Sequence, residues 1–529
     1  MLSTLLLYLS ACLWLGFSSV TAAEDAFVTK CLGFGDRINL PHVTVNFASY
    51  IPGGTNLSLA DSPPSCGESS QQVLTDTCRV AMAVTTSNRS QITLEAWFPR
   101  NYTGRFLSTG NGGISGCIQY YDLAYTASLG FATVGANNGH NGTSGEAFYK
   151  NPDVVEDFAW RSLYTGVDVG KKLTDQFYDE GFNRSYYLGC STGGRQGWKM
   201  VQSFPDLFDG VLVGSPAFNF VNLISWSGHF YPLTGTSNAS TFVTPAQWAA
   251  VGELVLDQCD GLDGAKDGII EDPDFCFPKI DSLGCASNNT TTSTCLSDAQ
   301  LHTVKSTYQP LRGVHGEALY PRMQPGVEAE EAYIMYGGQP FSYSTDWYRY
   351  VVYSNPEWDP LSLTSKDAEA ALAQNPFDIE TWNGDLEPFR KAGGKVLTYH
   401  GMADQIISSD ISKTYYDRVS ETMNLKSSQL DEFYRYFRIS GMGHCGGGDG
   451  ATAIGNQLTY LTSLDPQDNV LMALVQWVEK SIAPEFVRGS SVAANGSVEW
   501  SRKHCKYPEH NIYVGPGNYT DENAWKCVD

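Results

Sequence analysis

Short apolar runs alternate with segments of helical spacing from about residue 90 onward. Runs rich in β-branched and aromatic residues predict strands, and apolar positions three and four residues apart predict helices. The predicted strands are 91–98, 105–107, 130–134, 185–188 and 210–213, and the predicted helices are 162–178 and 196–204. This alternation indicates an α/β fold whose parallel sheet is covered by helices on both faces.

Residues 220–392 interrupt the alternation with many aromatic residues, four Cys, an acidic glycine-rich loop and irregular turns. The alternation resumes with predicted strands at 394–399 and 434–439 and a last helix at 468–481. We therefore predict one α/β domain built from two parts, residues 23–219 and 393–529. A second domain, residues 220–392, is inserted between them.

One glycine-flanked serine stands where a predicted strand meets a helix. Gly189-Cys190-Ser191-Thr192-Gly193 matches the pattern G-x-S-x-G, and the strand 185–188 runs directly into it. This is the strand–turn–helix context of a nucleophile elbow, in which a sharp turn presents the serine at the edge of the sheet. The sequence therefore predicts an α/β-hydrolase fold with the inserted domain as a large lid. An ordinary glycine-rich turn with a capping serine is the alternative.

A serine hydroxyl is a weak nucleophile unless a base accepts its proton. In this fold an acid and then a histidine follow the serine along the chain. Asp404 lies in the loop after the strand 394–399, and His444 lies in a glycine-rich loop after the strand 434–439. We therefore predict a catalytic triad of Ser191, Asp404 and His444.

Three other residues compete for the roles of base and acid. His140 also lies in a loop after a strand, but it precedes the serine. His400 precedes the acid, and Asp410 is the second choice for the acid itself. Chain order favours His444 and Asp404 over all three.

Cysteines flank two of the predicted catalytic residues: Cys190 precedes Ser191, and Cys445 follows His444. If serine and histidine form a catalytic hydrogen bond, their neighbours lie within several ångströms of each other. A disulfide needs Cα atoms about 4.4–6.8 Å apart. We therefore predict a Cys190–Cys445 bond that sets the distance between nucleophile and base, with other pairings of each cysteine as the alternative.

An oxyanion hole in this fold takes one N–H from the residue after the nucleophile and one from the loop after an early strand. Thr192 follows the nucleophile, and Gly110-Asn111-Gly112-Gly113 follows the predicted strand 105–107. We predict Thr192 as the first donor and Gly112 or Gly113 as the second.

The charge balance of the 529-residue chain excludes some partners. Lys and Arg total 34 and Asp and Glu total 57, which gives a net charge of −23. Nucleic-acid binding needs clustered cations, and an acidic surface is not attracted to anionic lipid. With 42% apolar residues the chain can form a large core.

The sequence also predicts export. Residues 1–22 contain an apolar stretch that suits a secretory signal peptide and is too short to span a bilayer, with a membrane anchor as the alternative. The 12 cysteines after Cys12 form an even set, and no C-x-x-C motif supports zinc as the alternative to disulfides. Ten acceptor sites for N-glycans begin at Asn56, Asn88, Asn101, Asn141, Asn183, Asn238, Asn288, Asn289, Asn495 and Asn518.

The Cys-Ser motif at Cys190-Ser191, the later Asp404, and the His-Cys motif at His444-Cys445 together resemble the fungal tannase and feruloyl esterase family. Chain length and cysteine layout are most similar to its type B feruloyl esterases. The resemblance covers most of the chain and implies hydrolysis of ferulate or p-coumarate esters through an acyl-Ser191 intermediate. The family often has Thr-Asp where this chain has Asn137-Asn138, which leaves the role of His140 open.

The acidic loop 259–272 offers oxygen atoms of the kind that Ca²⁺ prefers. The predicted ligands are the carboxylates of Asp260, Asp263 and Asp267 and the carbonyls of Ala265 and Ile269. A solvated acidic turn is the alternative, and the resemblance favours a structural calcium ion, since related esterases carry one in this loop.

Further disulfides are expected at Cys259–Cys276, Cys285–Cys295, Cys31–Cys78, Cys66–Cys117 and Cys505–Cys527, although the sequence alone allows many other pairings. Aromatic residues of the insertion could form an apolar slot for a phenolic ring or belong to its core. They are Trp226, Tyr231, Phe341, Tyr343 and Trp347.

The leading hypothesis is a secreted serine esterase acting on hydroxycinnamoyl esters of feruloylated plant cell-wall polysaccharide or on small phenolic esters. A tannase acting on galloyl esters would use the same catalytic groups. A non-catalytic secreted glycoprotein that binds wall polysaccharide is a second class. A glycosidase with two carboxylates is a third, and it leaves the Ser–Asp–His order unexplained.

Overall fold

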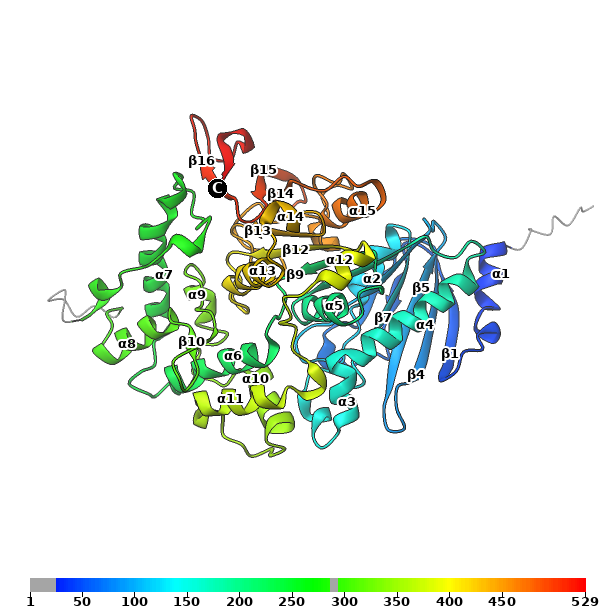
Figure 1. Cartoon of the computed structure of the whole chain (residues 1–529), viewed down its shortest axis with the longest axis horizontal. Helices are drawn as coiled ribbons and strands as arrows, with labels where there is room; N and C mark the ends of the chain where they lie inside the picture. Colours follow the sequence, from blue (N-terminus) through cyan, green and yellow to red (C-terminus); the bar gives the residue numbers. More distant parts are fainter. Residues whose placement is uncertain (1–24, 286–293) are drawn as a thin grey trace, which may run out of the picture.

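The computed structural model describes residues 25–285 and 294–529, so the predicted signal peptide, Cys12 and the acceptor sites Asn288 and Asn289 lie outside the described residues. Within these residues a nine-stranded sheet forms the centre of the molecule, with strand order β1-β4-β5-β7-β6-β8-β9-β12-β13 (Figure 1). Its strands are β1 (Val43–Ile51), β4 (Thr77–Thr85), β5 (Gln91–Pro99), β6 (Arg105–Thr109), β7 (Phe131–Ala136), β8 (Arg184–Cys190), β9 (Gly210–Gly214), β12 (Lys395–Gly401) and β13 (Tyr434–Ile439).

The sheet is mixed, which corrects the prediction of a parallel sheet. Strands β7, β6, β8, β9, β12 and β13 lie side by side in that order and run parallel to one another. Strands β1, β4 and β5 pair antiparallel, and β5 also pairs antiparallel with β7. A short turn joins β4 to β5, and strands joined in that way must run antiparallel, whereas parallel neighbours need a longer crossover.

Helices cover both faces of the parallel part, as predicted. Successive side chains of a strand point to opposite faces: Tyr187 of β8 packs in one core, and its neighbours Tyr186 and Leu188 pack in another. The first core includes α4 (Ser162–Phe177), α5 (Thr192–Ser203) and α13 (Asp410–Met423), and the second includes α2 (Tyr120–Ser128) and α15 (Val470–Lys480).

The chain leaves the sheet after β9 and returns at β12. Figure 1 shows most of this segment gathered at the side of the molecule away from β1 and β4. Its elements are α6 (Phe220–Thr234), α7 (Pro245–Cys259), α8 (Asp298–Thr307), β10 (Leu311–Arg312), β11 (Ala318–Tyr320), α9 (Glu328–Glu331), α10 (Ser342–Asp346), α11 (Ser365–Gln374) and α12 (Glu387–Ala392). Gln324 connects the segment to the loop after β12, because its side-chain amide donates to the carbonyl of Asp404 and accepts from the N–H of Ser409.

Smaller elements complete the described chain. They are α1 (Ala26–Leu32), α3 (Pro152–Glu156), α14 (Ser427–Leu430) and the paired strands β2 (Asn56–Ser58) with β3 (Ser70–Gln72), β14 (Phe486–Val492) with β15 (Val498–Cys505), and β16 (His510–Tyr513) with β17 (Trp525–Val528).

All six predicted disulfides are present. Cys31–Cys78 and Cys66–Cys117 lie in the N-terminal part, Cys259–Cys276 and Cys285–Cys295 in the segment between β9 and β12, and Cys505–Cys527 joins β15 to β17. The sixth, Cys190–Cys445, ties the end of β8 to the loop after β13.

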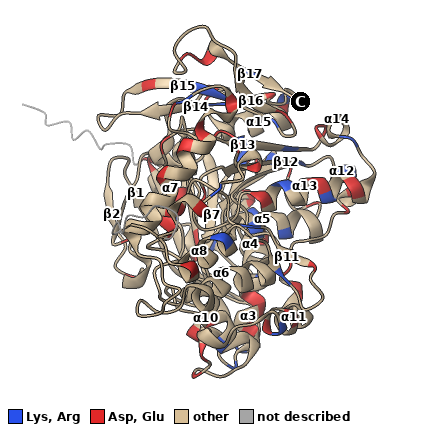
Figure 2. Cartoon of the chain, turned by 90° about the vertical axis from the view of Figure 1, so that its left-hand side faces the viewer, with Lys and Arg blue, Asp and Glu red and all other residues tan. Residues whose placement is uncertain are grey.

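Acidic residues occur on many elements of the face shown in Figure 2, where Lys and Arg are interspersed among them. Across residues 25–285 and 294–529, no helix combines the length and apolar character needed to cross a bilayer.

Candidate active site

Ser191 occupies a tight turn between β8 and α5. Its backbone has φ 62° and ψ −123°, a conformation that non-glycine residues rarely adopt. A Cβ atom at Gly189 would lie 2.7 Å from the carbonyl oxygen of Gly193, so the close approach of strand and helix requires glycine. Helix α5 begins at Thr192, four residues before its predicted start, because Ser191 is already its N-cap residue.

His444 and Asp404 form a direct pair. Nδ1 of His444 lies 2.8 Å from Oδ2 and 3.0 Å from Oδ1 of Asp404. The backbone N–H of His444 donates to the side chain of Gln405 at 3.0 Å, which holds the loop in place. Within the described residues, neither Nε2 of His444 nor the hydroxyl of Ser191 has a hydrogen bond, so both are available to each other or to a ligand.

Asp404 is fully buried, yet it is well supplied with donors. Its Oδ1 accepts from the backbone N–H groups of Ile406 and Ile407 at 2.8 and 2.9 Å. Its Oδ2 lies 3.2 Å from Nε2 of His400. Burial by itself raises the pKa of the Asp404 carboxyl, but the charge and hydrogen bond of His444 and the contact with His400 outweigh it and hold that pKa well below its usual range. The carboxylate is therefore ionised wherever the protein is folded near neutral pH.

The competing residues have other contacts. His140 is buried, and its Nε2 lies 3.0 Å from the carbonyl oxygen of Ile114. His400 contacts Asp404 through its Nε2, and its Nδ1 lies 2.7 Å from the hydroxyl of Ser412. Asp410 lies 3.8 Å from Arg322. The geometry thus joins His444 to Asp404 rather than to Asp410.

The Cys190–Cys445 bond, with Cα atoms 5.9 Å apart, brings the neighbours of Ser191 and His444 together. Ser191 and His444 line the same cleft. The adjacent strands β8, β9, β12 and β13 are parallel, and Ser191, Asp404 and His444 follow the carboxyl ends of β8, β12 and β13, where sites of α/β proteins open.

The glycine-rich loop lies against the start of α5. The hydroxyl of Thr192 donates to the carbonyl of Gly113 at 2.5 Å. The N–H of Asn111 is bonded to Gln196, whereas the N–H groups of Gly112, Gly113 and Thr192 have no hydrogen bond within the described residues. Those three N–H groups are the ones that the sequence predicted as oxyanion donors.

Gln196 is a site residue that sequence reasoning missed. Its side chain accepts from the N–H of Asn111 at 2.9 Å and donates to the side-chain oxygens of Asn111 and Asn138 at 3.0 and 2.9 Å. It therefore fixes the glycine-rich loop relative to the serine turn. Its position five residues after Ser191, at the start of the predicted helix, was the only signal in the sequence.

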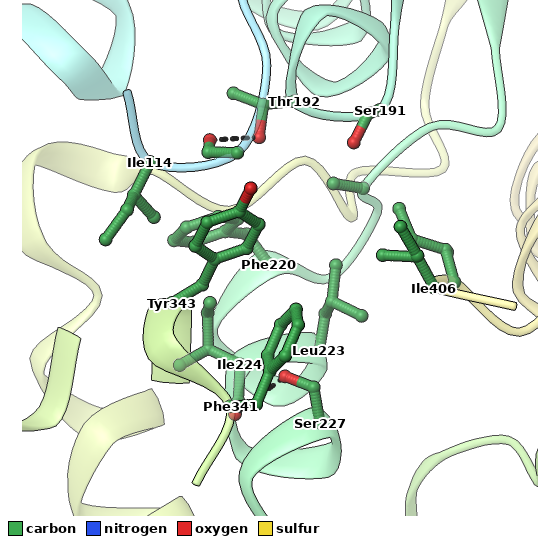
Figure 3. Close-up of a pocket in the computed structure, with 13 residues that line it drawn as sticks. Ile114, Ser191, Thr192, Phe220, Leu223, Ile224, Ser227, Phe341, Tyr343 and Ile406 are labelled. Atoms are coloured by element: carbon green, nitrogen blue, oxygen red, sulfur yellow. Dashed lines mark hydrogen bonds between the residues drawn. The ribbon is translucent and has the colours of Figure 1, made fainter. Parts of the chain in front are cut away.

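Two cavities meet at Ser191. The first is an apolar slot, and Figure 3 shows Ser191 at one end of it, with Phe341, Leu223 and Ile224 further along. Its lining residues are Gly113, Ile114, Ser191, Thr192, Ala217, Phe220, Leu223, Ile224, Ser227, Phe341, Tyr343, Ile406 and Ile407. Of the predicted aromatic residues, Phe341 and Tyr343 line this slot, while Trp226 and Trp347 belong to the core.

The second cavity is a wider cleft of about 340 Å³ that also contains His444 and Cys445. It shares Gly113, Ser191, Tyr343 and Ile406 with the slot.

The acidic loop is organised by its own backbone. Oδ1 of Asp260 accepts from the N–H groups of Asp267 and Gly268, and Oδ1 of Asp263 accepts from the N–H of Ala265. Oδ2 of Asp263 is buried and has no hydrogen-bond partner in residues 25–285 and 294–529. Burial, and then the charges of Glu271 and Asp267, raise the pKa of Asp263 to about 7.

Within the described residues, no three acidic, His or Cys side chains are arranged as a metal-binding group. The side chain of Asp267 is also engaged, since its Oδ2 accepts from Arg502 at 2.7 Å. A calcium ion would thus depend on Asp263, whose Oδ2 has no hydrogen-bond partner within the described residues, and on backbone carbonyls such as those of Ala265 and Ile269.

Fold and site together place the chain in the class of α/β proteins that carry a serine on a strand–helix turn beside an Asp–His pair. More narrowly, the chain belongs to the tannase and feruloyl esterase family, because the family model described as "Tannase and feruloyl esterase" matches residues 78–528.

Curated relatives match along nearly the whole chain. The "Probable feruloyl esterase B-2" of Aspergillus terreus is 64% identical over 524 residues, covering 98% of this chain and 99% of that protein. The "Feruloyl esterase C" of Talaromyces stipitatus is 61% identical over 530 residues, covering 100% of both chains.

Solved structures agree with the fold. The crystal structure of feruloyl esterase B from Aspergillus oryzae superposes with a TM-score of 0.94 at 57% identity and covers 95% of this chain and 100% of that one. Tannin acyl hydrolase from Aspergillus niger has a TM-score of 0.74 at 22% identity and covers 96% and 95%, which supports the fold alone.

Proposed function

We propose that this protein is a serine esterase that hydrolyses feruloyl and p-coumaroyl esters of plant cell-wall polysaccharides such as arabinoxylan. The observation that carries the proposal is the position of Ser191, beside the His444–Asp404 pair and at the junction of an apolar slot and a polar cleft. The relatives that are named feruloyl esterase support the choice of feruloyl as the acyl group.

In the proposed mechanism, Nε2 of His444 accepts the proton of the Ser191 hydroxyl while the serine oxygen attacks the ester carbonyl. The N–H of Thr192 and that of Gly112 or Gly113 stabilise the oxyanion, each contributing about 3–4 kcal/mol. His444 then protonates the departing alcohol oxygen. Water, deprotonated by His444, releases the acid from the acyl-Ser191 intermediate.

Asp404 keeps His444 in the tautomer that leaves Nε2 free, because Nδ1–H donates to the carboxylate. Its ionised state also stabilises the imidazolium that forms when the serine proton is transferred. The contact with His400 and the two backbone N–H groups hold the carboxylate in one orientation.

The apolar slot suits a hydroxycinnamoyl ring better than a galloyl ring. Of its polar lining groups, the hydroxyl of Thr192 donates to Gly113 and that of Ser227 bonds to Ser344. Tyr343 has no hydrogen bond within the described residues and can serve a single ring substituent. Three galloyl hydroxyls would therefore lose water without gaining enough partners.

We expect kcat/KM on methyl ferulate to exceed that on methyl gallate by about tenfold or more. Both are methyl esters, so the comparison isolates the acyl group, and it is made by measuring acid release at equal enzyme concentration. A preference for gallate would favour the tannase alternative. The absence of turnover on both esters would favour the non-catalytic glycoprotein.

In this proposal the segment 220–392 acts as a lid. Phe220, Leu223 and Ile224 of α6, together with Phe341 and Tyr343, supply one wall of the slot next to Ser191. These residues would bury the acyl group and exclude water from its ring.

We also propose that the protein is secreted and carries N-glycans. Six disulfides form, and disulfides persist in oxidising compartments. The acceptor asparagines within the described residues are all exposed: Asn56, Asn88, Asn101, Asn141, Asn183, Asn238, Asn495 and Asn518.

A structural calcium ion in the acidic loop is part of the same proposal. Removing it with EGTA should lower Tm by about 3–10 °C, because a ligand that binds only the folded state adds stability. Added CaCl₂ should restore Tm, and Asp263→Asn should remove the response to both. Asp206→Asn, an exposed carboxylate elsewhere, is the matched control. An unchanged Tm in the wild-type protein would argue for a solvated acidic turn.

A further inference from the structure

The wide cleft beside Ser191 differs in chemistry from the apolar slot. Besides Ser191 and Tyr343, which also line the slot, four polar side chains line it without a hydrogen bond in the part of the chain that the structure describes: Gln119, Asp122, Thr143 and Gln457. None of the described residues that line it is Lys or Arg. A ligand in this cleft therefore meets amide, hydroxyl and carboxyl groups, and it meets no fixed positive charge.

Asp122 is the only acidic residue that lines the cleft within the described residues. It lies in the first turn of α2. Burial, and then the charge of Glu68, raise the pKa of Asp122 to about 7. Oε2 of Glu68 is itself buried and has no hydrogen-bond partner among the described residues. The carboxyl group of Asp122 thus belongs to an acidic pair, and within the described residues neither carboxyl forms an ion pair with a basic side chain.

The two cavities divide an ester at its reacting carbonyl. They share Gly113, Ser191, Tyr343 and Ile406, so an acyl group in the slot leaves the alcohol half in the cleft. Carboxylate and amide oxygens accept hydrogen bonds from hydroxyl groups, and a sugar offers several of these in neighbouring positions. An anionic alcohol would instead be repelled by Asp122 and would find no cation.

We propose that this cleft is the binding site for a neutral, hydroxyl-rich alcohol such as a pentose unit, and that Asp122 selects it against an anionic alcohol. The inference rests on the proposed esterase function and adds to it the residue that discriminates the leaving group. Gln119 and Gln457 provide further hydrogen bonds to the same sugar.

The test uses three substrates with one acyl group: methyl ferulate, 5-O-feruloyl-L-arabinofuranose and 5-O-feruloylquinate. The full-length Asp122→Ala and Asp122→Asn variants are compared with wild type at pH 8, where Asp122 carries its charge. Relative to methyl ferulate, Asp122→Ala should lower kcat/KM on the feruloyl arabinose about ten- to hundredfold, the effect of one charge-assisted hydrogen bond. Asp122→Asn should raise the relative kcat/KM on the feruloylquinate about three- to tenfold.

Asp206→Asn is the control for the change in net charge, since this exposed residue lies before β9, at the opposite edge of the sheet from Ser191. Equal effects on all three substrates, or none, in folded Asp122 variants would overturn the inference and leave the esterase function intact. Failure of the wild-type protein to hydrolyse any of the three would overturn the esterase function itself.

Discussion

Replacing Ser191 by alanine is expected to lower kcat/KM on methyl ferulate by roughly 10⁴-fold or more, with the fold unchanged. The hydroxyl makes no hydrogen bond within the described residues, so its loss leaves no partner unpaired. The alanine methyl group fits the same turn, although the backbone at φ 62° remains unusual. Activity is measured as initial rates of ferulate release, and folding is checked by circular dichroism and Tm.

Ser203→Ala is the matched control, because Ser203 is an exposed residue at the other end of the same helix, α5. A fluorophosphonate should label the wild-type protein on the peptide that contains Ser191 and should leave Ser191→Ala unlabelled. Retention of more than about a tenth of the activity by folded Ser191→Ala would rule out an acyl-serine mechanism at this residue.

Removing the Cys190–Cys445 bond is expected to lower kcat by about tenfold or more at a temperature where the variant remains folded. The bond joins the residue before Ser191 to the residue after His444, so its loss frees the base to move relative to the nucleophile. The double variant Cys190→Ala/Cys445→Ala avoids an unpaired thiol. Because the bond closes a loop of 255 residues, a stability loss of roughly 3–5 kcal/mol is also expected.

The variant Cys505→Ala/Cys527→Ala separates these two effects. That bond joins two C-terminal strands across 22 residues, and neither cysteine lines the slot or the cleft. Its loss should lower Tm with little change in kcat at low temperature. If both double variants lose activity only in proportion to their unfolded fraction, the Cys190–Cys445 bond has a structural role alone.

Several site residues could be predicted because their signals are local. Ser191 was found from a strand, a glycine-flanked turn and a helix within about twenty residues, and the structure has that turn. Asp404 and His444 were found from their order after Ser191 and from the loops that follow two strands, and they form a direct pair. The Cys190–Cys445 bond followed from the adjacency of these cysteines to Ser191 and His444.

Other features depend on contacts between distant segments and left no such signal. The aromatic residues of the insertion lie in two different environments, since Phe341 and Tyr343 line the slot while Trp226 and Trp347 belong to the core. Chain order correctly set His400 aside as the base, but it could not show that His400 contacts the carboxylate of Asp404.

By itself, the sequence determined the element types, the position of the serine turn, and the order of acid and base. Only the tertiary structure decided that β1, β4 and β5 extend the sheet antiparallel, that Gln196 holds the glycine-rich loop, and that Asp122 shares a cleft with Ser191 and His444. The physical reason is that periodicity and turn chemistry report the local backbone and which face is apolar. The neighbour that a side chain meets is set by how helices and strands far apart in the chain pack together.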